Sequence, residues 1–551
     1  MIDDTIRAAA LRNAVQHEGR GNPKAVLGQL IALDPAMKKK AGELLPKIEK
    51  IVAEVNSLDS DSQHEALSGY DIKFKTAEKK KEGLPELENP KKVVMRFAPA
   101  PSGPLHIGHA RTIVLNGEYV KKYGGKFILR FEDTDPNNIF PESYDWIPEE
   151  IEWLGYHIDK IALQSDNIMS YYKHTKRILE QGSAYVCTCT SEKFKKLADA
   201  KKPCPCRDLA PEKNLERWDW MFNKYKPGDA VIRIKTDIAH KNPAMRDWPA
   251  VRIVDTPHPR TGTKYRVWPL YNLSNVIDDH ELGVTHVLRG KDHEVNTRRQ
   301  KYLFDYLGWK QPLTIHHGRL KLDESEVVLS KTKTRQMISE GKYTGWDDPR
   351  LATLRALRRR GIQPSAIQTL MLSLGVRPVD IAFSLTTLYT TNRKLVENSD
   401  RYFFVPDPRL INIAAERSKT AKIPYHPDHP ERGSRVFKFE PIDGYIKLNV
   451  SSEDLRETKR GKKIRLMDLA NIEFIGKTKA REIGGEMLPR KVQWLPEGEE
   501  CFIRMPDGKT LQGICDPEAA GLDQGTVIQF MRVGFVRLDS KNPLVFFFSH
   551  Q

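Results

Sequence analysis

The stretch VVMRFAPAPSGPLHIGHAR, residues 93–111, contains the pattern that decides the fold of this chain. Its apolar first half is typical of a buried strand in a parallel sheet, and the prolines of FAPAP end that strand. Between residues 109 and 123 apolar positions recur at intervals of three and four, which predicts a helix. KFILRFEDTDP, residues 126–136, supplies the next strand. Strand, tight turn, helix and strand form the opening unit of a doubly wound, Rossmann-type nucleotide-binding sheet.

The turn itself carries the chemistry. A helix N-terminus offers free backbone amides and a positive dipole to phosphate, and Gly108 leaves room for a purine or ribose against the turn. His106 and His109 can then donate hydrogen bonds to phosphate oxygens whose charge grows as a leaving group departs. The alternative is a pair of ordinary surface histidines on a capped helix. The position of the motif on a predicted nucleotide-binding turn favours the functional interpretation.

The charge of the whole chain indicates a polyanionic partner. Lys and Arg number 89 against 73 Asp and Glu, a formal net charge of +16 over 551 residues. Such an excess is typical of nucleic-acid binding, although a well-solvated surface would explain it too. No run of eighteen apolar residues occurs, and the first residues lack the layout of an export signal. We therefore expect a cytoplasmic protein without a membrane segment.

The pattern along the chain predicts a multidomain α/β protein. Helical periodicity dominates the start, short strands broken by Gly, Pro and Asp dominate the end, and an irregular stretch with four cysteines interrupts the sheet. We expect a helical domain at 1–90, a Rossmann catalytic domain at 91–183 and 271–345, an insertion at 184–270, a helical connector at 346–400 and a β-barrel region at 401–551.

Five ordered motifs carry a resemblance to a known family. RFAPAPSGPLHIGHAR (96–111) and VLSKT (328–332) resemble the two signatures of class I aminoacyl-tRNA synthetases. LRFEDTDP (129–136), YNLSNVIDDHELGVTHVLRG (271–290) and GWDDPRL (345–351) resemble motifs of the glutamyl and glutaminyl branch. NPKAVLGQ near the start is similar to archaeal glutamyl-tRNA synthetases. The resemblance implies a class I catalytic domain with an acceptor-binding insertion, and C-terminal β-barrels that read the anticodon.

The resemblance also implies which residues act on ATP. His106, His109 and Lys331 are implied as catalytic, and a lysine at the second signature can bind the departing pyrophosphate. Val328 and Thr332 stand where the general pattern has lysine and serine, as they do in the glutamyl and glutaminyl branch. The implied ATP-binding residues are Pro101, Ser102, Gly103, Gly108, Arg319, Leu320, Leu329 and Ser330.

The amino-acid substrate follows from two arginines. A glutamate side chain brings a carboxylate, and guanidinium compensates best for its desolvation. Arg96 opens the first motif, and Arg289 stands where glutaminyl relatives resemble one another in having a neutral residue. A buried Arg289 left unpaired beside an amide would cost about 1–3 kcal/mol, which favours glutamate. The alternative is a structural ion pair with Asp292. The implied glutamate-binding residues are Arg96, Glu132, Tyr271, Asn275 and Arg289.

The four crowded cysteines predict a metal site. They read CTC at 187–189 and CPC at 204–206. Four thiolates can close a tetrahedral Zn²⁺ site, and such a site clips two loops together without an open catalytic position. The alternative is a set of reduced, buried thiols. Related enzymes carry zinc in this insertion, so Cys187, Cys189, Cys204 and Cys206 are expected to hold a structural zinc.

The resemblance implies an ATP-dependent ligase that attaches glutamate to tRNA through a glutamyl-adenylate, with Mg²⁺ as a second cofactor. The expected partners are tRNA-Glu, with tRNA-Gln left open, and for the N-terminal helices tRNA or a protein. Three alternatives remain: a glutaminyl-tRNA synthetase, a tRNA-modifying glutamyl enzyme and a non-catalytic RNA-binding paralogue; small nucleotidyltransferases share the histidine motif as well. The RNA-binding paralogue conflicts with the retained histidines and lysine, and a small nucleotidyltransferase conflicts with the long basic C-terminal half.

Overall fold

The computed structural model describes residues 2–16, 19–34, 37, 40–70, 84–322, 330–456 and 458–551. The chain divides into two compact units, residues 1–83 and 84–551. In the first unit the described helices pack around Ile6, Leu30 and Val52, in agreement with the helical pattern of the N-terminal sequence. These helices are α1 (Ile2–Gln16), α2 (Pro23–Leu33), α3 (Ala41–Asn56) and α4 (Ser60–Ser68).

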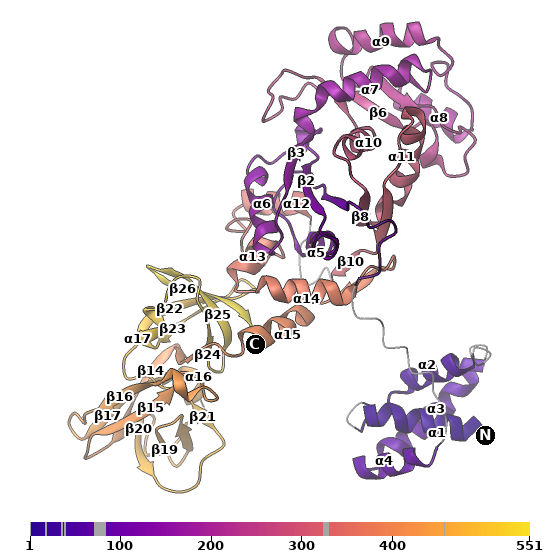
Figure 1. Cartoon of the computed structure of the whole chain (residues 1–551). Helices are drawn as coiled ribbons and strands as arrows, with labels where there is room; N and C mark the ends of the chain where they lie inside the picture. The colour runs from indigo at the N-terminus through magenta and orange to yellow at the C-terminus, as the bar shows by residue number, and fades with distance from the viewer. Residues whose placement is uncertain are drawn as a thin grey trace. The chain divides into compact units, whose positions relative to one another are not determined.

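A parallel sheet with the strand order β3-β2-β1-β8-β9 belongs to the second unit, and helices surround it (Figure 1). Its strands are β1 (Val94–Phe97), β2 (Lys126–Phe131), β3 (Lys160–Leu163), β8 (His286–Gly290) and β9 (Leu313–His317). The chain adds β2 and β3 on one side of β1 and later adds β8 and β9 on the other. The carboxyl end of β1 is therefore the point where the strand order reverses, the usual ligand-binding edge of such sheets.

Helix α5 (Ile107–Tyr123) follows β1 directly. The predicted helix began at residue 109, whereas the structure begins it two residues earlier, because the His106 side chain caps it. The helix ends at Gly124, which adopts the left-handed conformation with a φ of 61°. Its apolar face, including Ile113 and Val114, is buried against the sheet core. The other helices of this region are α6 (Ser143–Trp153), α7 (Ile168–Glu180), α10 (Tyr271–Glu281) and α11 (Glu294–Leu307).

The insertion forms its own antiparallel sheet in the order β4-β5-β6-β7. The strands are β4 (Ala184–Cys187), β5 (Val231–Ile234), β6 (Pro249–Ile253) and β7 (Val267–Pro269), with helices α8 (Ser191–Asp199) and α9 (Pro211–Asn223). Trp248 and Trp268 are buried in its core together with side chains of α7 and α11. Cys187 is the last residue of β4, so this strand fixes the position of one cysteine of the cluster.

The segment after the parallel sheet is helical, as predicted, but it also contains a strand. Strand β10 (Leu320–Leu322) pairs in parallel with β11 (Ile381–Phe383). The β11 residues lie between helices and lack a sustained alternating pattern, so only the tertiary pairing makes them a strand. The helices are α12 (Lys331–Ser339), α13 (Leu354–Arg359), α14 (Pro364–Leu374) and α15 (Leu385–Val396).

The C-terminal part consists mainly of two sheets of mixed strand direction, each with its own apolar core. One core surrounds Trp494 and the other surrounds Phe530 and Phe546. Together with a β15–β16 hairpin they form the β-rich region that the sequence predicts. None of the helices within the described ranges has the length and apolar character needed to cross a membrane.

The strands of the C-terminal part are β12 (Arg401–Tyr402), β13 (Phe404–Pro406), β14 (Pro408–Ala414), β15 (Lys419–Pro424), β16 (Ser434–Phe439), β17 (Tyr445–Ser451), β18 (Lys463–Leu466), β19 (Ala470–Phe474), β20 (Lys479–Ile483), β21 (Lys491–Val492), β22 (Glu499–Arg504), β23 (Thr510–Cys515), β24 (Val527–Phe530), β25 (Gly534–Lys541) and β26 (Leu544–His550). Two short helices, α16 (Ser452–Leu455) and α17 (Pro517–Ala520), connect them.

Candidate active site

Two histidines lie where the turn after β1 leads into α5: His106 is the N-cap residue, and His109 lies in the first turn of the helix. Nδ1 of His106 accepts the backbone N–H of Gly108 at 3.1 Å, and Nδ1 of His109 accepts the backbone N–H of His106 at 3.2 Å. Since each Nδ1 is an acceptor, each neutral ring carries its proton on Nε2. Burial lowers the pKa of His106 to about 4 and the pKa of His109 well below its ordinary value. Near pH 7 both rings are therefore neutral Nε2–H donors.

Two of the predicted residues, Gly103 and Gly108, are glycines for different steric reasons. Gly103 has a φ of +137°, and a Cβ there would lie 3.3 Å from the ring of Trp346. A Cβ at Gly108 would lie only 2.8 Å from the ring of His106. The sequence suggested that Gly108 makes room for a purine or ribose, whereas in the structure its missing side chain makes room for the capping histidine.

Lys331 reaches the same turn from the start of α12. Its Nζ donates to the backbone oxygen of Gly103 at 3.1 Å and lies 3.4 Å from Oγ of Ser102. Ser330 caps α12 through its hydroxyl, so the predicted lysine is held at the first position of the helix. Burial lowers the pKa of Lys331 to about 8. The second signature is thus brought against the first, while its Leu329 lies outside the described residues.

The remaining predicted ATP-binding residues lie on the turn and on β10. The backbone oxygen of Pro101 accepts the N–H of Phe140 at 2.7 Å. Arg319 is exposed, and its backbone N–H donates to Asp380 at 2.9 Å. Within the described ranges no hydrogen bond or ion pair joins Arg319 or Leu320 to the histidines or the lysine. Pro101, Ser102, Gly103 and Lys331 are therefore assembled here, whereas the ATP-binding roles of Arg319 and Leu320 stay predictions.

A buried guanidinium organises part of the predicted amino-acid-binding residues. Arg130 donates to Asp279 and to Asn275, both at 2.6 Å, and more weakly to Glu132 at 3.4 Å. Asn275 in turn donates to Oε1 of Glu132 at 2.8 Å. Arg96 donates through Nε to the same oxygen of Asp279 at 3.2 Å. Three of the predicted residues, Arg96, Glu132 and Asn275, are thus joined in one network.

The electrostatic surroundings of Arg289 differ from those of Arg130, which donates to carboxylates. It is 5% exposed, and its guanidinium donates only to neutral oxygens in the described structure: Thr297 at 2.7 Å, Gln300 at 2.8 Å and the hydroxyl of Tyr271 at 3.3 Å. Its Nε has no partner among the described residues. Asp292, the alternative partner, instead lies 3.5 Å from the ring of the adjacent histidine. Burial, together with the nearby positive charge of Arg96, lowers the pKa of Arg289, and the more distant carboxylate of Asp279 offsets this only in part.

Sequence reasoning missed two residues of this pocket, Arg130 and Asp279. Arg130 lies inside the quoted motif LRFEDTDP, but only the sheet shows that its side chain reaches α10. Asp279 lies four residues after Asn275 and eight after Tyr271, so helical spacing places it on nearly the same face of α10. That spacing was a readable signal, because a third polar residue on one face of a buried helix requires partners.

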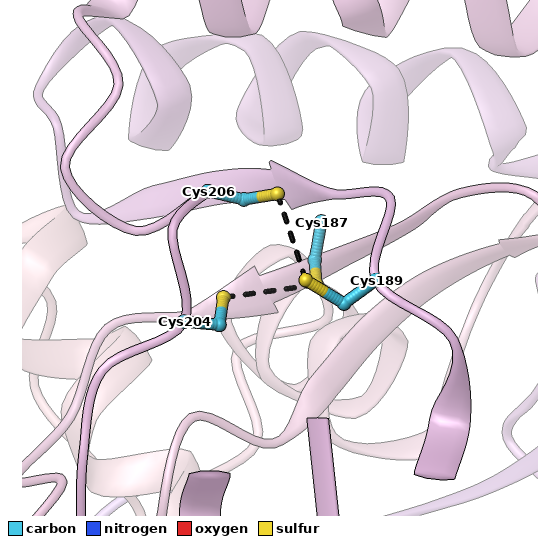
Figure 2. Close-up of side chains that lie close together, drawn as sticks. All are labelled: Cys187, Cys189, Cys204 and Cys206. Atoms are coloured by element: carbon cyan, nitrogen blue, oxygen red, sulfur yellow. Dashed lines mark hydrogen bonds between the residues drawn. The ribbon is translucent and has the colours of Figure 1, made fainter. Parts of the chain in front are cut away.

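The four predicted cysteines converge at the end of β4 and the loop after α8 (Figure 2). The Sγ atoms of Cys187 and Cys204 lie 3.8 Å apart, those of Cys189 and Cys206 lie 3.9 Å apart, and all four lie within 4.8 Å of one another. These are free thiols rather than disulfides. Tetrahedral zinc at about 2.3 Å from each sulfur places the sulfurs about 3.8 Å apart, so the donor set fits zinc.

Comparison with known proteins places the chain in one family. The family described as "tRNA synthetases class I (E and Q), catalytic domain" matches residues 92–397. The two "anti-codon binding domain" families of the same class match residues 399–488 and 491–539. A glutamate–tRNA ligase of Pyrococcus furiosus is 50% identical, with 96% of each chain covered. Those of Thermococcus onnurineus and Methanocaldococcus jannaschii are 47% and 46% identical, with 100% and 98% of each chain covered.

Proposed function

The chain belongs to the class I tRNA synthetases of the glutamate and glutamine branch, among the archaeal glutamate–tRNA ligases, and from this premise we propose how its residues perform the reaction. The reaction attaches glutamate to tRNA at the expense of ATP. The α-carboxylate of glutamate attacks the α-phosphorus of ATP, pyrophosphate leaves, and the terminal ribose hydroxyl of tRNA then takes the glutamyl group from the adenylate. The glutaminyl alternative is not favoured, and the two anticodon-binding regions argue against a tRNA-modifying enzyme that lacks them.

We assign the two histidines to the phosphates. As neutral rings with their protons on Nε2, His106 and His109 can donate hydrogen bonds to oxygens that gain charge during the displacement. The capping interactions fix both tautomers before the substrate arrives, so the donors need little reorganisation. Lys331, whose ammonium group contacts the same turn, supplies the positive charge that stabilises the departing pyrophosphate. Catalysis is then positioning and charge stabilisation, and no side chain acts as a nucleophile.

We assign the pocket beneath the turn to glutamate. Glu132 is the acidic group available for the α-amino group of the substrate, and Arg130 and Asn275 hold its carboxylate in place. Arg96 and Arg289 are the cations available for the side-chain carboxylate. The observation that carries this assignment is the neutral environment of Arg289, since a buried guanidinium without a carboxylate partner is best satisfied by an acidic ligand.

Two metals complete the proposal. Mg²⁺, which aminoacyl-tRNA synthetases use together with ATP, would neutralise phosphate charge when bound. Zn²⁺ would be held by Cys187, Cys189, Cys204 and Cys206 and would clip the β4 end to the loop after α8. Four protein ligands leave no open position, so its role is structural. We further propose that the insertion at 184–270 binds the acceptor end of tRNA-Glu and that residues 401–551 read its anticodon.

Aminoacylation of purified tRNA-Glu and tRNA-Gln, each with glutamate and with glutamine, tests this function. We expect ATP-dependent charging of tRNA-Glu with glutamate, at least about 100-fold above glutamine, since a buried charge left unpaired costs a few kcal/mol. The tRNA-Gln arm decides whether the enzyme charges one tRNA or two. Preferential charging with glutamine would refute the assignment of Arg289.

A further inference from the structure

A buried carboxyl group that the reaction above does not use lies under the histidine turn. Glu150 on α6 is 3% exposed. Its Oε2 accepts the backbone N–H of Leu105 at 2.8 Å. Its Oε1 is buried and has no hydrogen-bond partner in the part of the chain that the structure describes. An acid in this position is costly to bury, so its contacts with the turn require an explanation.

The backbone that Glu150 holds is the one from which His106 projects. On the other side, the oxygen of Leu105 accepts the N–H of Leu354 at 2.9 Å, and the N–H of Ile107 donates to Ala352 at 3.1 Å. The turn is therefore held by hydrogen bonds to α6 on one side and to the residues at the start of α13 on the other. Without Glu150, the N–H of Leu105 would lose its acceptor one residue before the capping histidine. Its carboxyl thus helps to set the direction of the His106 ring.

Glu150 also belongs to the electrostatic surroundings of Lys331. The charged groups that act on Glu150 are Lys331 from α12, Arg355 from α13 and Glu149 from its own helix. Arg355 already donates to Glu149 at 2.9 Å. The groups that act on Lys331 are Glu150, which favours its charged form, and Arg335, which opposes it. Glu150 is therefore the acidic neighbour of the lysine that binds the departing pyrophosphate.

We propose that Glu150 is a positioning residue for adenylate formation, which holds the Leu105–His106 turn and provides the acidic neighbour of Lys331. The inference rests on the proposed function, because it assigns Glu150 to the same phosphate-binding centre. Burial raises the pKa of Glu150 to about 8, close to the value of about 8 for Lys331. The two groups therefore titrate in the same range, and removal of the acid should make the lysine lose its proton at lower pH.

The test uses the full-length chain and three variants. In E150Q the amide oxygen can still accept the N–H of Leu105, but the acidic charge is gone. E150M removes both the acceptor for Leu105 and the acidic group but keeps a similar side-chain volume. E152Q is the matched control, because Glu152 is an exposed acid on the same helix and is not among the groups that act on Glu150 or Lys331 in the described structure. Pyrophosphate exchange with tRNA present is measured from pH 6 to 9.5, together with thermal unfolding.

We expect E150M to lower kcat of exchange by about 10-fold or more with little change in KM for glutamate, because a displaced turn weakens phosphate stabilisation only. E150Q should retain most of kcat at pH 7, but the decline of kcat/KM for ATP at high pH should begin at lower pH. E152Q should match the wild type in both. Wild-type kcat in E150M together with a wild-type pH profile in E150Q would overturn the inference.

Two further outcomes separate the possible failures. If E150M is too unstable to assay, the pH profile of E150Q decides, and an unchanged profile counts against the role of Glu150. If the wild-type chain shows no glutamate-dependent exchange, the proposed function itself is wrong and the inference is refuted with it. Wild-type activity with unaffected variants would refute the role of Glu150 alone.

Discussion

Replacement of Arg289 by cysteine should weaken the preference for glutamate over glutamine. The guanidinium is buried and donates only to neutral oxygens of Thr297, Gln300 and Tyr271 in the described structure. A hydrogen bond to a charged group is worth about 1.5–3 kcal/mol. Since 1.4 kcal/mol corresponds to a factor of ten, kcat/KM for glutamate should fall about 10- to 150-fold in R289C. The value for glutamine should stay constant or rise, because the unpaired charge is gone.

Two control variants separate charge from structure. R289K keeps the charge but lacks the planar fork of donors, so its selectivity should lie between those of the wild type and R289C. T297V removes one of the neutral partners and leaves the guanidinium in place, so it should retain the preference for glutamate. Thermal unfolding of each variant shows whether the loss of contacts to Thr297 and Gln300 has destabilised the fold.

The assay is aminoacylation of tRNA-Glu under conditions that give kcat/KM for each amino acid separately. The ratio of the two values reports discrimination in the transition state and is insensitive to the fraction of active enzyme. A wild-type ratio in R289C would refute the argument, whatever happens to the absolute rate. An equal loss for both amino acids would mean that Arg289 supports the pocket without reading the substrate side chain.

Three other predictions address the network, the metal and the pH dependence. D279N should destabilise the chain by about 3 kcal/mol in chemical unfolding, because it leaves buried guanidinium groups without their charge partner; an unchanged midpoint would contradict this. Protein purified without chelator should contain about one zinc per chain, and C204S should contain markedly less by metal analysis; equal contents would exclude the cysteine site. In pyrophosphate exchange, His106 and His109 should stay neutral between pH 6 and 8, because burial lowers the pKa of His106 to about 4 and that of His109 well below its ordinary value. Lys331 is charged below its pKa of about 8, so kcat/KM for ATP should fall as the pH rises above 8, and a profile that rises there would contradict its role.

Local patterns predicted the parts of this protein that depend on neighbouring residues in the chain. The histidine turn and the strands around it follow from apolar periodicity and turn residues, and the four thiols of the cysteine cluster stand in two pairs only seventeen residues apart. The start of α5 was missed by two residues, because histidine is not among the usual capping residues. Strand β11 was missed because its partner among the described strands is β10, which lies about sixty residues earlier.

The side chains that sequence reasoning missed all act over long separations. Arg130 bonds to Asp279 across 149 residues, and Glu150 bonds to Leu105 across 45 residues. Nothing in the local sequence distinguishes a buried arginine or glutamate from an exposed one, since both types are usually exposed. These pairings become visible only in the folded chain, where Arg130 of β2 meets Asp279 of α10 and Glu150 of α6 meets Leu105.

In the glutamate site that we propose, the distribution of charge lets one set of residues read both the amino group and the side-chain carboxylate of the substrate. Arg130 is surrounded by carboxylates and is therefore neutralised by the protein, and Arg96 shares Asp279 with it. Arg289 has no such partner in the described residues, so the uncompensated positive charge lies at its end of the pocket. Glu132, at the other end, offers negative charge. In that proposed site, the amino group of the substrate meets negative charge and its side-chain carboxylate meets positive charge, so glutamate would gain from both interactions and glutamine only from the first.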